Sequence, residues 1–244
     1  MPRMCLLGAG GGGGVPASIA GLVLWLKADA IGGLANTDPV VTWEDSSSAN
    51  NDADQGTAGN RPTYRTNVIN GKPVVRFDGT DDYLQVDPEL NTAEGDLTVI
   101  AVIRPTSVGG IETFYSEGSS TDDLQLRVAR INGATPKAEA AHLNTAGDNI
   151  TTIGTTTILD NTAYLVTAKW TATTQVIYLA GTQEDSDAFG SAPTVDRTAI
   201  GCLLRAAAGD FFGGDIAELI VYDSALSDAN RGTVETYLTT KYAL

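Results

Sequence analysis

Strand-length apolar runs, separated by turn residues, fill most of this chain of 244 residues. Between residues 22 and 222 no run repeats its apolar residues at helical spacing, so a parallel sheet built from βαβ units is not expected. Leu124–Ile131 shows the strand pattern most clearly, because apolar and polar residues alternate along it. Many short strands with regular turn signals predict an all-β fold, either a sandwich or a barrel.

The expected strands follow one another closely. They cover residues 22–26, 40–43, 74–77, 83–86, 97–104, 112–116, 124–131, 138–143, 156–159, 164–170, 176–180, 199–204 and 216–222. Glu44–Arg61 lacks periodicity and is rich in Ser, Asn, Asp and Gly, so it is predicted to be a polar loop.

One short helix is predicted near the C-terminus. Ser227 suits the N-cap position, and Asp228 falls in the first turn, where the helix dipole favours negative charge. The buried stripe of this helix is expected to consist of Val234, Tyr237, Leu238 and Tyr242. No linker divides the rest of the chain, so residues 16–244 are expected to form a single domain.

Residues 1–15 are expected to be a flexible, Gly-rich tether. Met4, Leu6 and Leu7 form a short apolar tip ahead of the run Gly10–Gly14. This tip is too short for a classical signal peptide, which needs an apolar stretch of about 7–15 residues. No stretch approaches the roughly 20 apolar residues of a membrane span. We expect the tip to anchor the protein to a particle or, alternatively, to act as a plug that docks into a neighbouring subunit.

The charge balance restricts the partners. The formal net charge is −15, from 15 basic and 30 acidic side chains. Nucleic acids and anionic membranes are bound through basic surfaces, so neither is expected as a partner. The two cysteines, Cys5 and Cys202, do not indicate a disulfide framework, and Cys202 is expected to be a buried thiol in an apolar strand.

Several separated segments together resemble the laminin-G-like branch of the concanavalin A-like lectin/glucanase superfamily. They are the opening run Gly21–Asp29, the turn Trp43–Asp45, the segment Gly71–Leu84 and the closing strand Gly213–Asp223 with the helix after it. The resemblance covers roughly residues 21–244. It implies a jelly roll of two antiparallel sheets with one short C-terminal helix. Members of the group bind sugars, proteins or metal, or serve as structural modules.

Glycoside hydrolysis is not expected, although glucanases share this fold. The reaction needs two carboxylates across one cleft, and the Glu-x-Asp-x-x-Glu string of the laminarinase-type relatives is absent. Of the nearest acidic clusters, Glu184–Asp187 is interpreted as a loop. The Asp215–Glu218 pair would lie on opposite faces of a regular strand. The single histidine, His142, cannot build a metal cluster by itself. No catalytic residue is therefore predicted.

A metal site is a stronger hypothesis. Asp78, Asp81 and Asp82 are a compact source of the hard oxygen ligands that Ca²⁺ prefers. The alternative interpretation is a tight turn in which Asp78 caps backbone amides and Gly79 takes a positive φ.

Sugar binding requires exposed aromatic residues. Trp25, Trp43 and Trp170 lie in apolar strand contexts and are predicted to belong to the core. Five aromatic residues lie nearer to loops and are candidate platforms for a sugar ring: Tyr64, Tyr115, Phe189, Phe211 and Phe212. The polar loop Ser46–Asn60 is of the kind that often carries recognition.

Together these features favour a non-enzymatic sandwich within a larger assembly. We expect a phage virion protein (a capsid decoration, head-fibre or tail-appendage subunit) that is made in the host cytoplasm. Its expected partners are other virion proteins, reached through the N-terminus, host surface glycans and further copies of itself. The alternative is a free bacterial carbohydrate-binding module, and the third candidate is a glycan-active hydrolase.

Overall fold

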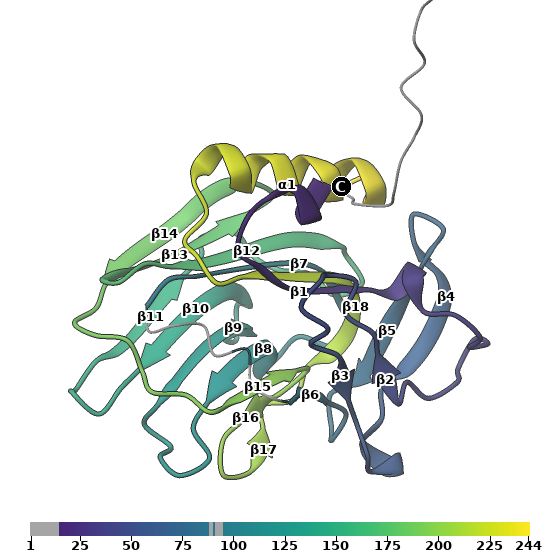
Figure 1. Ribbon diagram of the computed structural model, residues 1–244, viewed down its shortest axis with the longest axis horizontal. Coiled ribbons are helices and arrows are strands. Elements are labelled where there is room, and N and C mark those ends of the chain that lie inside the picture. Colours follow the sequence, from purple (N-terminus) through teal and green to yellow (C-terminus); the bar gives the residue numbers. More distant parts are fainter. Residues whose placement is uncertain (1–14, 88–89, 91–94) are drawn as a thin grey trace, which may run out of the picture.

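Two large antiparallel sheets lie face to face in the computed structural model, which describes residues 15–87, 90 and 95–244 (Figure 1). The first sheet contains, in spatial order, β14 (Thr182–Ala188), β13 (Thr174–Leu179), β12 (Tyr164–Trp170), β7 (Leu97–Pro105), β18 (Gly213–Tyr222), β5 (Lys72–Asp78) and β4 (Thr63–Ile69), with β1 (Leu22–Lys27) also paired to β18. The second contains β11 (Asn149–Ile153), β10 (Lys137–Leu143), β9 (Leu126–Asn132), β8 (Ile111–Gly118), β15 (Arg197–Ile200), β6 (Leu84–Val86), β3 (Ala53–Asp54) and β2 (Thr42–Trp43). A small hairpin of β16 (Leu203–Leu204) and β17 (Ala208–Gly209) completes the strands. The predicted all-β, two-sheet jelly-roll sandwich is confirmed.

The core between the sheets is built from the inward residues of both. Trp43 and Trp170 are fully buried there. Trp25 is also buried, but it lies on the outer face of the first sheet, in a second apolar cluster beneath the helix. The prediction that all three tryptophans are buried in the protein is therefore confirmed.

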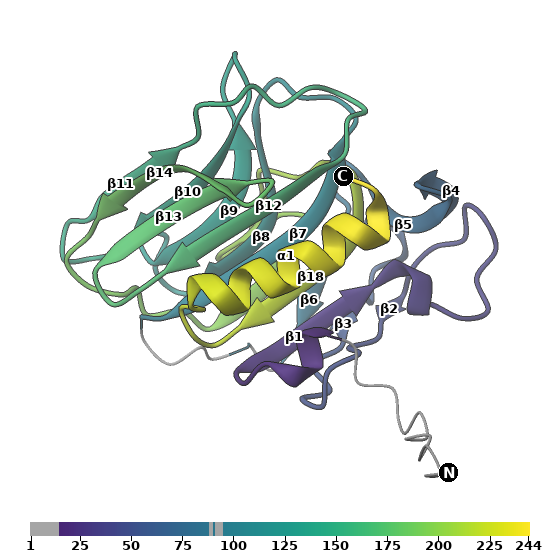
Figure 2. The ribbon, with the colours of Figure 1, turned by 90° about the horizontal axis from the view of Figure 1, so that it is seen from above.

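Helix α1 (Asp228–Tyr242) lies across the outer face of the first sheet (Figures 1 and 2). The Ser227 hydroxyl accepts a hydrogen bond from the backbone N–H of Asn230 at 3.3 Å, so this residue is the N-cap. Val234, Leu238 and Tyr242 are buried against the sheet. Tyr237 is only partly buried and packs edge-on against Trp25. The predicted helix and its apolar stripe are confirmed, with Tyr237 at the margin of that stripe.

The strand β14 was predicted to be a loop, and that prediction was wrong. Its sequence lacks the apolar alternation of a half-buried strand, because most of its side chains are exposed. It forms because Ala180 and Gly181 both take a positive φ and return the chain as a tight hairpin from β13. Its acidic side chains, among them Glu184 and Asp185, lie along a sheet edge, where charge disfavours pairing with another chain.

The strand expected at residues 156–159 is absent; the neighbouring strand is β11, at Asn149–Ile153. The Glu184 carboxylate accepts hydrogen bonds from the backbone N–H groups of Thr155 and Thr156. These hydrogen bonds satisfy backbone N–H groups of the segment, so the segment does not need to pair with a neighbouring strand.

None of the helices within residues 15–87, 90 and 95–244 is long and apolar enough to span a membrane.

Candidate functional site

The turn between β5 and β6 brings three acidic side chains together. Ligand atoms of Asp78, Asp81 and Asp82 all lie within 4.8 Å of one another. The Oδ1 atom of Asp78 accepts hydrogen bonds from the backbone N–H groups of Thr80 at 2.8 Å and Asp81 at 3.2 Å. Gly79 has a φ of 77°, as the tight-turn interpretation requires. The turn geometry and the carboxylate cluster therefore coexist.

Burial makes one of these carboxylates unusual. Asp82 is buried, and its Oδ2 atom accepts a hydrogen bond from the backbone N–H of Asp78 at 3.0 Å. Desolvation, with a smaller contribution from the charge of Asp78, raises the pKa of Asp82 to about 7. A divalent cation would relieve this repulsion, and the oxygen donors present suit Ca²⁺. The structure thus gives the metal hypothesis its geometry, and the presence of the metal stays a prediction.

A cleft of about 490 Å³ opens beside this turn. It is lined by Asp78 and Gly79, by residues of the β7–β8 turn, by Glu112 at the start of β8, and by Phe211 and Gly213 ahead of and within β18. Glu112 is buried, and its Oε2 atom accepts a hydrogen bond from the backbone N–H of Gly213 at 3.2 Å. Burial raises the pKa of Glu112 to about 7. The cleft therefore has carboxylates from two strands.

One partly exposed aromatic side chain, Phe211, lies at this cleft, and the partly exposed Tyr83 packs against it. The rings of Tyr83 and Phe211 pack against each other, with centroids 6.5 Å apart and planes inclined by 44°. Phe211 lines the cleft itself. An aromatic ring beside carboxylates is a surface that can stack a sugar ring while accepting hydrogen bonds from its hydroxyls.

Of the five aromatic platforms expected from the sequence, only Phe211 is partly exposed. The prediction was wrong for the four buried ones, Tyr64, Tyr115, Phe189 and Phe212. Phe212 packs between the rings of two other core phenylalanines, and Phe189 stacks on His142 at 4.1 Å. All four belong to the inter-sheet core. Tyr64 on β4 and Tyr115 on β8 point inward because side chains alternate in direction along a strand.

The sequence analysis missed one member of the cleft, Glu112, and the neighbouring Tyr83, which packs against Phe211. Glu112 sits within a predicted strand, and nothing in its local pattern distinguishes it from a solvated edge residue. Tyr83 follows Asp82 directly, so its proximity to the acidic turn could have been noticed.

The Asp215–Glu218 pair was predicted to lie on opposite strand faces, and that prediction was wrong. The register of β18 against β7 shifts between Ile216 and Glu218, which marks a β-bulge. Asp215 binds Arg76 and Arg104, and both carboxylates lie on the outer, helix-side face. The inward side chain of Ile216 separates them along the strand.

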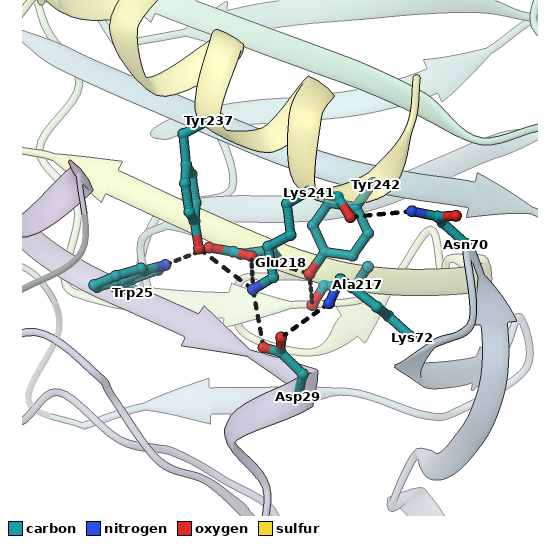
Figure 3. Close-up of polar contacts among 9 residues, drawn as sticks. All are labelled: Trp25, Asp29, Asn70, Lys72, Ala217, Glu218, Tyr237, Lys241 and Tyr242. Carbon is teal, nitrogen blue, oxygen red and sulfur yellow. Dashed lines mark hydrogen bonds and ion pairs between the residues drawn. The ribbon is translucent and has the colours of Figure 1, made fainter. Parts of the chain in front are cut away.

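Glu218 is the centre of a buried polar network beneath α1 (Figure 3). It accepts hydrogen bonds from Trp25 Nε1 at 2.5 Å, Lys241 Nζ at 2.7 Å and Tyr242 Oη at 3.0 Å. Lys241 also binds Asp29 at 2.9 Å. Burial by itself would lower the pKa of Lys241, but the charge and hydrogen bonds of Glu218 and Asp29 raise it overall. Each of these charges is committed to a partner, so the network ties the helix to the sheet.

The predicted polar loop Ser46–Asn60 contains the short strand β3 and the 3₁₀ turn η3 (Ala58–Asn60), and its first residues are held by the Asp45 side chain. The Asp45 carboxylate accepts hydrogen bonds from the backbone N–H groups of Trp25 at 2.8 Å, Ser47 at 2.8 Å and Asn51 at 2.9 Å. The predicted anchor residues Met4, Leu6 and Leu7 lie outside the described residues.

The sequence profile of the concanavalin A-like lectin/glucanases superfamily matches residues 78–230 of this chain. No curated protein matches the chain by sequence. Among solved structures, domain 4 of AbnA, a GH43 extracellular arabinanase from Geobacillus stearothermophilus in complex with arabinotriose, aligns with a TM-score of 0.57 and 13% identity. The alignment covers 86% of this chain and 95% of that one.

Two further structures are similar. The binding domain of Paraclostridial Mosquitocidal Protein 1 aligns with a TM-score of 0.60 at 13% identity, over 91% of this chain and 52% of that one. The Ruminococcus gnavus IT-sialidase CBM40 bound to alpha2,3 sialyllactose aligns with a TM-score of 0.51 at 20% identity, over 58% and 84%. Likenesses at these identities establish the lectin-like fold alone.

Proposed function

Since the chain belongs to the concanavalin A-like lectin/glucanase superfamily, we propose that it is a non-enzymatic glycan-binding module. The binding site is the cleft beside the β5–β6 turn. One observation carries the proposal: the ring of Phe211, which packs against Tyr83, is partly exposed at a cleft that is also lined by Asp78 and Glu112. Two structures with the same fold are binding units by their names, and a third is a domain of an arabinanase in complex with arabinotriose, which supports binding over catalysis.

The chemistry of the cleft suits a sugar. The face of Phe211 can cover the C–H face of a pyranose or furanose ring, because an aromatic side chain presents a large, flat apolar surface. Carboxylate oxygens accept hydrogen bonds from sugar hydroxyls. A Ca²⁺ ion at Asp78, Asp81 and Asp82 would neutralise the turn beside the bound sugar. When bound, the ion would also supply coordination positions for hydroxyl groups of the sugar.

A first experiment is a glycan array that includes arabinotriose and α2,3-sialyllactose. We expect a defined preference for one glycan class. The Phe211→Ala variant should then bind the preferred glycan about tenfold more weakly, which corresponds to about 1.4 kcal/mol. Calorimetry would measure both dissociation constants.

The matched control is Ile153→Ala, which removes an exposed apolar side chain from the distant edge strand β11. It should leave affinity unchanged. If the Phe211→Ala variant and the unaltered protein bound the glycan with equal affinity, the cleft would not be the binding site. Release of new reducing ends from the bound glycan would instead support the third candidate function, a glycan-active hydrolase.

Calcium binding at the acidic turn should depend on pH. Because burial raises the pKa of Asp82 to about 7, this carboxyl must lose a proton before it can ligate. The Ca²⁺ affinity should therefore fall about tenfold as the pH decreases from about 7.5 to about 6. Titration calorimetry at both pH values measures this change. The Asp82→Asn variant should bind more weakly and lose the pH dependence, whereas absence of heat at either pH would refute the metal site.

The setting that we propose for this binding is the surface of a phage particle. The support comes from the sequence: an apolar tip, Met4–Leu7, and a glycine run stand directly before the domain. Mass spectrometry of purified particles from a producing host should then detect this chain. Its presence only in the medium as free protein would favour the bacterial carbohydrate-binding module. Association with further copies of the chain also stays a prediction.

A further inference from the structure

An apolar groove runs along the outward face of α1. Its volume is about 860 Å³, and its walls are mainly apolar atoms. It is lined by Val15 and by helix residues that include Ala229, Gly232, Thr236 and Thr240. The groove lies on the side of the helix away from the sheet, and none of its residues lines the glycan cleft. Two of its lining residues, Tyr237 and Lys241, also belong to the Glu218 network.

The composition of this helix face is unusual for a solvated surface. Exposed helix faces normally carry charged residues, which also have good helix propensity. Here glycine and threonine, which are weaker helix formers, occupy the groove between Asp228 and Lys241. Small side chains with exposed methyl groups allow another chain to approach the helix closely.

The position of Val15 indicates what could occupy the groove. Val15 begins the 3₁₀ turn η1 (Val15–Ser18), which contacts α1 and is held by the hydrogen bond from Tyr222 Oη to the carbonyl oxygen of Pro16 at 3.0 Å. Val15, which directly follows residues 1–14 in the chain, therefore lines the groove itself. Among them are the apolar residues Met4–Leu7.

We propose that the groove on α1 is the docking site for the apolar segment Met4–Leu7 of the same chain. The seven residues Gly8–Gly14 connect that segment to Val15. Extended, they span at most about 25 Å, whereas the helix rises about 17 Å between Ala229 and Thr240. The segment can therefore reach every part of the groove without strain.

Two physical effects favour this occupant over a second copy of the chain. A short flexible connection gives the segment a local concentration of order millimolar at the groove. The charges are also compatible, because Arg3 stands just before the segment and Asp228 lies at one end of the groove with an exposed side chain, although Lys169 and Arg231 lie 3.8 Å and 3.7 Å from its carboxylate. Burial of the leucine side chains supplies the main driving force.

Docking in this manner would have a consequence for assembly. A segment seated in its own groove is withheld from a particle or from a neighbouring subunit. This inference is independent of the proposed glycan binding, because no groove residue lines the glycan cleft.

Cys5 allows a direct test in the full-length protein. It lies within the segment, and the other thiol, Cys202, is fully buried. A Thr236→Cys substitution places an accessible thiol in the middle of the groove. Under mild oxidation at low protein concentration, we expect a disulfide within one chain. Mass spectrometry should detect tryptic peptide 4–27 joined to peptide 232–241, on protein that migrates as a monomer.

The matched control is Asn230→Cys, which is exposed on the same helix but does not line the groove. Its disulfide should form at least about tenfold more slowly. Adding Leu6→Ser and Leu7→Ser to the Thr236→Cys variant should slow cross-linking by a similar factor, because the apolar contact is removed. Equal rates at positions 236 and 230 would overturn the proposal. A disulfide-linked dimer would also overturn it, and would assign the groove to the segment of a second copy.

Discussion

Replacement of Glu218 by glutamine should lower the free energy of unfolding by about 3 kcal/mol. The carboxylate is fully buried and accepts hydrogen bonds from Trp25, Lys241 and Tyr242. Glutamine keeps the size of the side chain but removes the negative charge, and its amide group cannot accept at both positions. Lys241 would then keep Asp29 as its remaining ion-pair partner. The loss is large because a mostly buried ammonium group would be left under-compensated.

Urea denaturation would measure this loss as a lower midpoint with an unchanged slope. The control is Asp123→Asn, which removes an exposed carboxylate 3.7 Å from Arg205. Surface ion pairs contribute about 0–1 kcal/mol, so this variant should unfold almost like the unaltered protein. If both variants lost the same small amount, the network beneath α1 would not be a determinant of stability.

Replacement of Gly201 by alanine should destabilise the protein by about 3–5 kcal/mol. Gly201 has a φ of 87°, a conformation that costs a residue with a side chain about 1–2 kcal/mol. In addition, a Cβ atom there would lie 2.3 Å from a ring carbon of Phe77. Phe77 is buried in the inter-sheet core and packs against Phe212, so it has little room to move.

Gly33→Ala separates the two causes. Gly33 has a similar φ of 78°, but no atom lies within 4 Å of its added Cβ. This variant should therefore show the backbone cost alone, about 1–2 kcal/mol. Thermal unfolding of both variants measures the difference. Similar losses in the two would mean that the core accommodates the extra methyl group at Gly201.

Much of the fold follows from local sequence pattern. The alternation around Leu126–Asn132 and the apolar run of β1 identify strands because side-chain direction along a strand repeats every two residues. Ser227 marks the start of α1, because its hydroxyl satisfies a backbone N–H that the helix leaves unpaired. The acidic turn at Asp78–Asp82 was also recognisable, since its residues are adjacent in the chain.

The remaining features could not be predicted, for specific reasons. The strand β14 carries no apolar pattern, and it forms through its hairpin and its contacts with residues 155–156. The faces of Asp215 and Glu218 depend on a bulge in β18, which a regular two-residue repeat cannot reveal. Tyr64 and Tyr115 stand near predicted loops, yet both contribute to the core.

The sequence by itself determined the class of this protein: an all-β sandwich with one capped helix and an acidic turn. These features are local, because turn residues, caps and side-chain alternation act within a few residues. Only the tertiary structure decided which distant residues meet. Phe211 and Glu112 join the turn at Asp78 because β18 and β8 begin at the rim of the sandwich where β5 ends. Such convergence depends on strand order and register, which arise from contacts between residues far apart in the chain.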